Sequence, residues 1–447
     1  MYVTTFDDIT IENCCFVCAG FVVTKDNLDY SEEAGVTAKI IKGEKSIMKI
    51  IYIAYSCNPY QGSEDKFGWK IPYQSFVNGN TVSIFTKPGS KPFIEKFEKI
   101  NNVKLNVYYI DIPKLCKKFF KGALYSIQLQ IWNKHVFPIV KKLVDNDGYE
   151  IIHQINPIEF RSVGKYWKIK KAKFVCGPLG GGEKIPKGLR YYSRFSFVSE
   201  GLRTIANIIN KILKKKALKM CDALLFANKE TQKYCGFNNT NSICYSEVGC
   251  DEFDIDKKNY DKSDKIIFLT CGRLVYRKGI EFLLDAIDGL DVSLPFELRI
   301  VGGGRQEKFL KKKMFRNKNS SKISFVGKIP FVLTQEQYKN SDVFIFPSIR
   351  ETTGSVILEA MALGLPVITI DSFGGALIVD ENNGYMFKGR NRKEYIKSLR
   401  DIMQHCIENK NELMVKSEYA IKTASNMYWS NKYSFYNGIY IRLLKIK

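Results

Sequence analysis

Short apolar runs alternate with stretches of helical periodicity along most of the chain. From Met48 onward, one series of such runs has the length and bounding residues of buried strands, and its first member is "KIIYIAY". Strands that alternate with helices predict a parallel sheet with helices on both faces. The runs of this first series are 49–55, 81–87, 104–110, 150–155, 173–178 and 223–228.

A second series of the same kind follows a polar, acidic stretch. It comprises 265–272, 296–303, 322–327, 343–348 and 366–371, and long helical patterns occupy 393–447. Two doubly wound domains are therefore expected to face each other, with ligands at the carboxyl ends of the strands, in the cleft between the domains.

The expected organisation has five parts. They are an N-terminal extension of unclear role (1–47), a Rossmann-like acceptor domain (48–245), a linker (246–264), a Rossmann-like donor domain (265–425) and a C-terminal helix that packs back on the first domain (426–447). The extension has no clear period, and whether it is a genuine part of the protein stays open.

Composition narrows the partners rather than the fold. The 447 residues carry a formal charge of +23, which favours anionic partners such as phosphorylated small molecules, nucleic acid or anionic lipid. The 12 cysteines are scattered, with Cys15 and Cys18 the single CxxC, which is typical of a reducing cytoplasm. No apolar run is long enough to span a bilayer, and "FDDITIEN" is acidic where a signal peptide needs basic residues.

The stretch "ETTGSVILEAMALGLPVITID", residues 351–371, predicts a loop, a short helix and a buried strand. Thr352 or Thr353 is expected to cap the helix, and Gly364 to end it. Glu351 then lies in the loop before the helix and Glu359 about two turns inside it. An exposed helix N-terminus attracts anions, so a phosphorylated ligand is expected there.

A second candidate stretch, "CGRLVYRKG", follows the first strand of the second domain. Alone, Arg273 and Lys278 fit solvated cations of a surface turn. Together with the helix N-terminus downstream, they fit the stabilisation of a diphosphate leaving group.

These motifs, with "VGGG", "ISFVGKI" and "VFIFPSIRETTGSVILEAMALGLPVI", resemble glycosyltransferase family 4 of the GT-B fold, across almost all of the second domain. The resemblance implies an α/β protein with two Rossmann-like domains facing a central cleft. It implies that Glu351 contacts the donor sugar and Glu359 the ribose, while Arg273 and Lys278 bind the diphosphate. Gly354 and Ser355, at the helix start, join them as donor-binding candidates, although "ETTGS" departs from the more usual E-G-F-G.

The first domain is similar to a narrower set of these enzymes through "CNPYQGSEDKFGW", "HQINPIEFRSVGKYWK" and "CGPLGGGE". By this resemblance His153 is expected at a strand end on the cleft edge as a catalytic residue, although a lone histidine is usually a core residue. Gly62 is a donor-side candidate because a residue without a side chain admits close approach of a phosphate or sugar. The acceptor-side candidates are Ser63, Glu64, Gly181, Gly182 and Glu183, and the three consecutive glycines fit either a flexible loop or an anion-binding nest.

Two D-x-D pairs are the sequence's candidates for a metal site. Asp145 and Asp147 fit a turn before a strand, and Asp254 and Asp256 fit the linker. Both pairs are interpreted as solvated acids, so no metal and no cofactor are expected besides a nucleotide sugar as co-substrate.

The segment "TIANIINKILKKKALK", residues 204–219, sets isoleucines on one face and lysines on another. It fits either a core-facing helix with a wet back or an interfacial helix on anionic lipid. The basic-aromatic cluster "LCKKFFKG", residues 115–122, favours the lipid interpretation.

The leading hypothesis is a retaining, metal-independent hexosyltransferase that moves a sugar from a nucleotide diphosphate to a carbohydrate acceptor. The acceptor is expected to be lipid-linked, in cell-surface polysaccharide synthesis, and the enzyme to be cytoplasmic, with peripheral contact at the inner face of the cell membrane. Alternatives are a nucleotide-sugar epimerase on the same scaffold, a nucleic-acid-binding protein suggested by charge alone, and an inactive scaffold. The donor base, the sugar, the acceptor, the linkage and the oligomeric state stay open.

Overall fold

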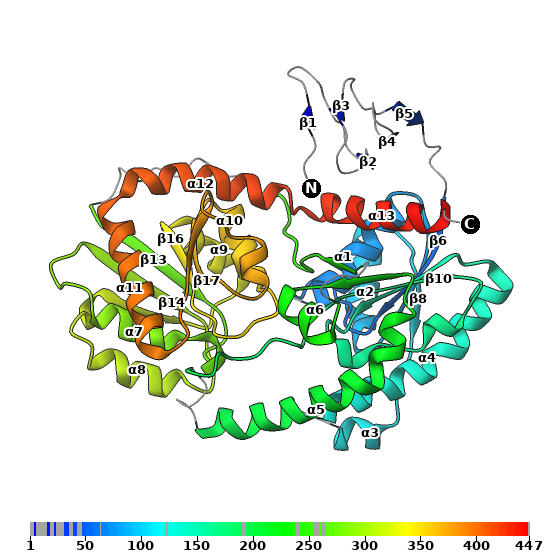
Figure 1. The fold of residues 1–447 in the computed structure, drawn as a ribbon, viewed down its shortest axis with the longest axis horizontal. Helices are drawn as coiled ribbons and strands as arrows, with labels where there is room; N and C mark the ends of the chain where they lie inside the picture. Colours follow the sequence, from blue (N-terminus) through cyan, green and yellow to red (C-terminus); the bar gives the residue numbers. More distant parts are fainter. Residues whose placement is uncertain are drawn as a thin grey trace.

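The computed structural model describes residues 47–62, 64–120, 124–189, 194–237, 242–253, 260 and 264–445, except for the side chains of 194–199. Within the N-terminal extension it gives only short strands: β1 (Thr4–Thr5), β2 (Phe16–Val17), β3 (Val22–Val23), β4 (Ser31–Ala34) and β5 (Lys39–Lys42). Two lobes make up the rest of the molecule (Figure 1).

The N-terminal domain is built on a seven-stranded parallel sheet of order β12-β11-β10-β9-β6-β7-β8. The central strands are apolar and buried on both faces because helices cover each side. The strands are β6 (Lys49–Ala54), β7 (Thr81–Thr86), β8 (Asn106–Tyr109), β9 (Ile151–Asn156), β10 (Lys173–Leu179), β11 (Ala223–Phe226) and β12 (Ser242–Cys244).

The C-terminal domain has a six-stranded parallel sheet of order β15-β14-β13-β16-β17-β18. Its strands are β13 (Ile266–Cys271), β14 (Phe296–Val301), β15 (Ile323–Gly327), β16 (Val343–Phe346), β17 (Val367–Ile370) and β18 (Gly384–Phe387). The two doubly wound domains confirm the predicted fold class. Among the described strands of these two domains, the sequence pattern missed β12 and β18, which are edge strands of three and four residues.

Helices follow most strands in both domains. Those of the N-terminal domain are α1 (Glu64–Val77), α2 (Lys91–Asn101), α3 (Lys114–Phe119), α4 (Tyr125–Asp147), α5 (Arg194–Lys219) and α6 (Lys229–Cys235). Those of the C-terminal half are α7 (Ile280–Asp288), α8 (Glu307–Phe315), α9 (Phe331–Lys339), α10 (Ser355–Ala362), α11 (Arg392–Glu408), α12 (Lys410–Ser425) and α13 (Trp429–Lys445).

Helix α13 belongs to the N-terminal domain although it ends the chain. It runs along the top of that lobe in Figure 1, and its aromatic side chains enter the core beneath β6. Trp429, Tyr433, Tyr436 and Tyr440 pack there among residues such as Ile50. The chain therefore crosses between the domains twice, once near residue 250 and once between α12 and α13.

The first crossing corrects the picture of a solvated linker. Residues 246–250 are all buried, and Cys250 is 1% exposed. Cys250 N donates to the Met427 carbonyl, so the two crossings are hydrogen-bonded to each other. The polar residues that suggested a solvated segment start just beyond, and residues 254–259 and 261–263 lie outside the described part of the chain.

Candidate active site

Residues of both domains and of the first crossing line a common cavity. Glu64, at the start of α1, comes from the N-terminal domain; Ser355 and Glu359 come from α10; Glu247 comes from the crossing. The donor-side and acceptor-side candidates Glu359, Ser355 and Glu64 are thereby brought into one site. Because its walls belong to both domains, this cavity depends on how the domains dock.

The carboxylates of this cavity are held where ionisation is costly. Burial raises the pKa of Glu64 to about 7, although the Ile158 amide, 2.8 Å away, stabilises the anion. Burial likewise raises the pKa of Glu247 to about 7, and burial raises that of Glu359 against the opposing charge of Lys66. The cavity therefore carries acidic groups to which the hydroxyls of a bound sugar or ribose can donate hydrogen bonds in place of water.

The N-terminus of α10 borders this cavity and differs in detail from the sequence prediction. Gly354 is the N-cap, with φ of 106°, and no side chain caps the helix. A Cβ at Gly354 would lie 2.5 Å from the Phe346 ring, so glycine is required there. The predicted cap by Thr352 or Thr353 is wrong, because Thr353 instead donates its hydroxyl proton to Glu247 at 2.6 Å. Glu359 is the fifth residue of the helix, little more than one turn in.

A second, cationic pocket lies at the carboxyl ends of β13 and β16. Its lining includes Arg273 and Lys278. Gly272, which directly precedes Arg273 and also lines the pocket, has a φ of 148°. The arginine side chain is exposed, whereas the lysine is mostly buried. The structure thus brings together the two cations that the sequence assigned to a diphosphate.

Glu351 ties this pocket to the loop before α10. Its Oε2 accepts from Lys278 Nζ and, at 2.7 Å, from Arg277 Nη1. Burial alone would raise the pKa of Glu351, but the charges of Lys278 and Arg277 outweigh it and hold the pKa below its usual value. Burial lowers the pKa of Lys278, and the Glu351 charge offsets this only in part. Glu351 is therefore an ionised, oriented carboxylate beside the cationic pocket.

His153 does not lie at the cleft edge. It is the third residue of β9, is 0% exposed, and packs beneath α13. Its Nδ1 is 2.6 Å from the Tyr440 hydroxyl and its Nε2 is 2.8 Å from the Gly177 carbonyl. Burial lowers its pKa to about 4, so it is neutral at pH 7. The predicted cleft-edge position is wrong, because the strand continues for three more residues beyond it.

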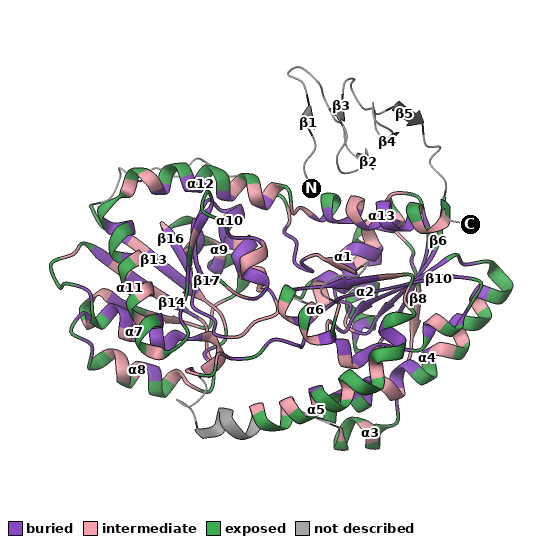
Figure 2. Ribbon diagram, viewed as in Figure 1, coloured by how far each residue is buried: buried purple, intermediate pink, exposed green. Residues whose placement is uncertain are grey.

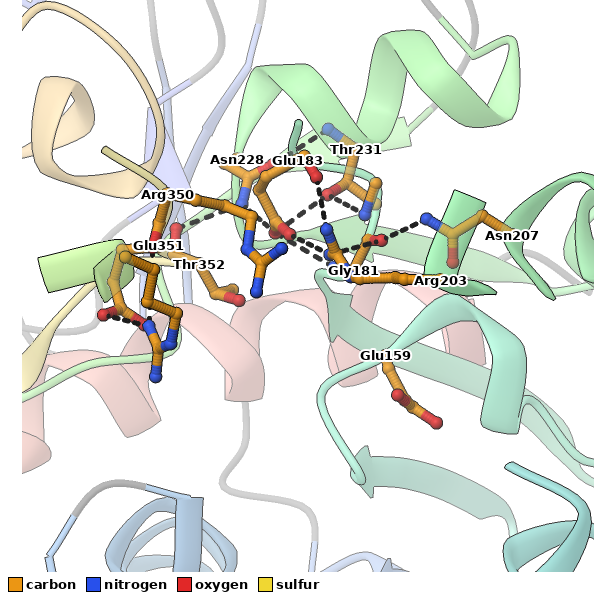
Figure 3. Close-up of polar contacts among 12 residues, drawn as sticks. Glu159, Gly181, Glu183, Arg203, Asn207, Asn228, Thr231, Arg350, Glu351 and Thr352 are labelled. Atoms are coloured by element: carbon orange, nitrogen blue, oxygen red, sulfur yellow. Dashed lines mark hydrogen bonds and ion pairs between the residues drawn. The ribbon is translucent and has the colours of Figure 1, made fainter. Parts of the chain in front are cut away.

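The glycine-rich loop after β10 is held by the protein's own side chains (Figure 3). Gly181 N donates to Glu183 Oε1 at 2.9 Å, and Gly182 N donates to Thr231 Oγ1 at 3.1 Å. Glu183 is 2% exposed, and its Oε2 pairs with Arg203. Protein acceptors already take the amide protons of Gly181 and Gly182, so these two amides do not form an open anion nest.

The other candidates lie apart or outside the description. Gly62 is exposed with open space around it, and Ser63 lies outside the described residues. Asp145 and Asp147 occupy the last turn of α4 rather than a separate turn, and Asp145 pairs with Lys141 and Lys171. Asp254 and Asp256 also lie outside the description. Among the described residues, no group of three or more His, Cys, Asp or Glu side chains is placed to hold a metal ion.

Helix α5 turns its isoleucines outward, which contradicts the core-facing interpretation (Figure 2). The exposed fractions are 57% for Ile205, 52% for Ile208, 51% for Ile209, 71% for Ile212 and 68% for Leu213. Lys214, by contrast, faces the domain and donates to the Val163 carbonyl at 3.0 Å. Over the described residues, no helix combines the length and apolarity needed to cross a bilayer.

The sequence analysis missed several residues of the site. Arg277, which pairs with Glu351, was not among the predicted site residues, although it directly precedes Lys278 in the sequence. Glu247 was hidden in the supposed linker, although Val248 and Cys250 beside it were a sign of burial. Asn228, whose side chain reaches the Thr352 carbonyl, gave no signal at all.

Two facing Rossmann-like domains, with a cationic pocket near the N-terminus of α10 in the second, have the arrangement of the GT-B fold. Residues 251–421 match the model of the family described as glycosyl transferases group 1. This match covers the C-terminal domain, which is less than half of the chain, and shows that this domain is similar to the glycosyl transferases group 1 family. The narrower assignment to glycosyltransferase family 4 stays a prediction.

Known proteins and solved structures are also similar to this chain. An uncharacterized glycosyltransferase, MJ1607 of Methanocaldococcus jannaschii, is 31% identical over 180 residues, which cover 37% of this chain and 46% of that protein. The match thus spans less than half of the relative. Sucrose-phosphate synthase from Thermosynechococcus elongatus superimposes with a TM-score of 0.63 at 16% identity, over 89% of this chain and 99% of its own. Alr3699/HepE of Anabaena, solved in complex with UDP, gives a TM-score of 0.57 at 14% identity, over 88% and 100%. These structures share the fold.

Proposed function

We propose that this protein is a retaining glycosyltransferase that uses a nucleotide-diphosphate sugar. The observation that carries the proposal is the cationic pocket of Arg273 and Lys278, with Glu351 held ionised beside it and the α10 N-terminus nearby. Developing negative charge on a leaving diphosphate is stabilised by such fixed cations and backbone amides. The UDP complex of a protein with the same fold supports a nucleotide donor.

In the proposed reaction the acceptor hydroxyl attacks the anomeric carbon on the face from which the diphosphate departs. The new glycosidic bond forms as the bond to the phosphate oxygen breaks, and that oxygen takes the hydroxyl proton. Arg273 and Lys278 stabilise the charge on the diphosphate. Glu359 and Ser355 hold the ribose, and Glu351 lies beside the reacting sugar. No protein nucleophile and no metal are required.

The test is a screen of nucleotide sugars and nucleotide diphosphates by thermal unfolding. A ligand at 100 times its Kd stabilises the folded state by about 2.7 kcal/mol, so a true donor raises Tm clearly. We expect one nucleotide family to stand out, and incubation with that donor and a carbohydrate acceptor to yield a glycoside of retained configuration. Conversion of the sugar without any acceptor would instead indicate an epimerase.

The acceptor is proposed to be lipid-linked, with the enzyme peripheral on an anionic membrane. This rests on the exposed apolar face of α5 and on Leu115 and Phe119 of α3, which are 68% and 65% exposed. Figure 1 shows α3 and α5 on the same side of the N-terminal domain. Exposed lysines such as Lys211 and Lys215 accompany this face. Apolar insertion and attraction to anionic headgroups add to each other in such a surface.

Vesicle sedimentation tests the membrane contact. Binding is expected on anionic vesicles at low salt, to weaken as salt rises, and to be nearly absent on neutral vesicles. Serine at Ile209 and Ile212 is expected to abolish most of it, whereas Val415→Ser, an equally exposed apolar site on α12, is the matched control. Because Lys214 is bonded to the domain, the apolar face is a cleaner target than the lysines. Unchanged binding of the double variant would refute the contact.

A further inference from the structure

Three hydrogen bonds join the N-terminal domain and the first crossing to the loop Arg350–Thr353, which leads into α10. Asn228 Nδ2 donates to the Thr352 carbonyl at 3.0 Å, Thr353 donates to Glu247 at 2.6 Å, and Arg350 pairs with Glu200 of α5. The loop also receives Gly374 N on the Thr352 carbonyl at 2.9 Å, from its own domain. The donor-side loop is thus held from both domains.

Asn228 is placed so that its amide has one arrangement. Its Oδ1 accepts from Thr231 N at 2.8 Å and caps α6, which leaves the NH₂ group to donate twice. One proton goes to Glu183 Oε1 at 2.7 Å and the other to the Thr352 carbonyl. Both protons and one acceptor position of this buried amide are used, so its orientation is fixed.

Glu183 accepts a hydrogen bond from the Asn228 amide and so fixes the orientation of that side chain (Figure 3). Its Oε1 accepts from Gly181 N, Asn228 and the Thr231 hydroxyl, and its Oε2 pairs with Arg203 at 3.2 Å. Arg203 also donates to the Glu183 carbonyl at 2.7 Å and the Gly181 carbonyl at 2.9 Å. Because the protein's own donors occupy the Glu183 carboxylate, it does not need a substrate as a hydrogen-bond partner. It acts on the loop through its hydrogen bond with the Asn228 amide.

Close backbone contact supports the same arrangement. A Cβ at Gly180 would lie 2.5 Å from the Thr352 side chain, across the domain boundary. The absence of a side chain at Gly180 is therefore what lets the glycine-rich loop approach the donor-side loop.

We infer that Glu183, Asn228 and Glu200 are positioning residues that hold the loop Arg350–Thr352, and with it Glu351, in place for transfer. The inference rests on the proposed function, and it assigns to Glu183 a role different from acceptor binding. From the N-terminal domain, a hydrogen bond from the Asn228 amide and the ion pair of Glu200 with Arg350 hold the loop, so its geometry depends on that domain although the loop belongs to the other one.

The experiment compares Asn228→Asp with Asn391→Asp. Both asparagines cap a helix through Oδ1, and Asn391 does so at α11, away from the loop. Aspartate keeps the cap but cannot donate to Thr352. We expect N228D to lower kcat/KM for the donor at least tenfold per folded molecule, and N391D to leave it unchanged. Because a carboxylate beside Glu183 also costs stability, a role confined to folding would lower Tm and leave kcat/KM of the folded fraction intact.

Glu200→Gln is the second variant, since it removes the charge from the pairs with Arg350 and Arg203 and keeps the size of the side chain. It is expected to lower kcat/KM several-fold, with the larger part in kcat. Turnover within twofold of the parent in both variants would overturn the inference. The nucleotide diphosphate selected by the thermal screen serves as the binding probe. If the parent neither binds such a probe nor transfers sugar, the proposed function fails; if the parent is active and the variants match it, only the inference fails.

Discussion

Alanine substitution at Arg273 and at Lys278 separates the catalytic use of a cation from its structural use. Both side chains line the pocket proposed for the diphosphate. Lys278 also neutralises Glu351, whereas Arg273 is exposed and, among the described residues, pairs with no carboxylate. The two variants should therefore lose activity alike and stability unequally.

The catalytic loss follows from the charge that develops on the leaving diphosphate. Removing one preorganised donor or cation from such a site costs about 2–4 kcal/mol of transition-state stabilisation. This corresponds to a fall in kcat/KM of roughly 30- to 900-fold, with the donor KM rising if the ground-state diphosphate is held as well.

The stability loss differs because of what each side chain leaves behind. Without Lys278, the buried Glu351 keeps only Arg277, at 2.7 Å. Breaking a buried ion pair costs about 3–5 kcal/mol, so with one partner retained we expect about 1–3 kcal/mol. R273A is expected to stay within about 0.5 kcal/mol of the parent, as surface substitutions do.

The measurements are kcat/KM with the identified donor and urea unfolding of each variant. The depressed pKa of Glu351 stabilises the folded state above the carboxyl's unfolded pKa, and this contribution is lost as the pH falls through the folded value. K278A should therefore lose less stability on acidification than the parent. Near-normal turnover in both variants would refute the diphosphate pocket, and equal destabilisation by both would refute the structural role of Lys278.

Three further predictions follow from the same structure. His153→Gln should keep turnover per folded molecule. Because burial lowers the pKa of His153 to about 4, the parent loses up to about 3 kcal/mol of stability as the pH falls from 6.5 to 4. Urea titrations at several pH values should show a smaller loss in the variant. Transfer should persist in EDTA, and activity lost on chelation but restored by manganese or magnesium would contradict a metal-free reaction. A chain starting at Met48 should fold and stay active, since Met48 N already donates to Asn80 Oδ1 at 3.0 Å; an insoluble truncation would contradict this.

The fold could be predicted because its sheets are parallel and buried on both faces. Such strands are short continuous apolar runs, and their alternation with helices specifies a doubly wound domain without any long-range information. Strand β9 shows the limit of this approach. Its apolar run, 150–155, agrees with the strand to within one residue. The run does not show which side chains face the core, and His153, the third residue of the strand, was expected at the cleft although it lies in the core.

Helix α5 shows a different limit. Its period shows that one face is apolar, but periodicity is the same whether that face meets a core, a lipid surface or another protein. Only the position of the helix, determined by bonds such as that from Arg203 to the Gly181 carbonyl, decides which face is outward. The structure therefore adds the exposure, and with it the reason to test lipid.

The candidate site divides in the same way. Glu351, Arg273 and Lys278 come from motifs within one domain, where local spacing at strand ends predicts which side chains meet. Glu247 and Asn228 act across the boundary between domains, and their roles depend on contacts between segments more than 100 residues apart in sequence, as in the pairs with Thr353 and Thr352. Burial makes these contacts consequential, because a buried carboxylate or amide without its partner is costly. It follows that the donor-side loop cannot move relative to the N-terminal domain without exchanging these bonds for others. Substitutions at the boundary are therefore expected to change transfer even where they touch no substrate.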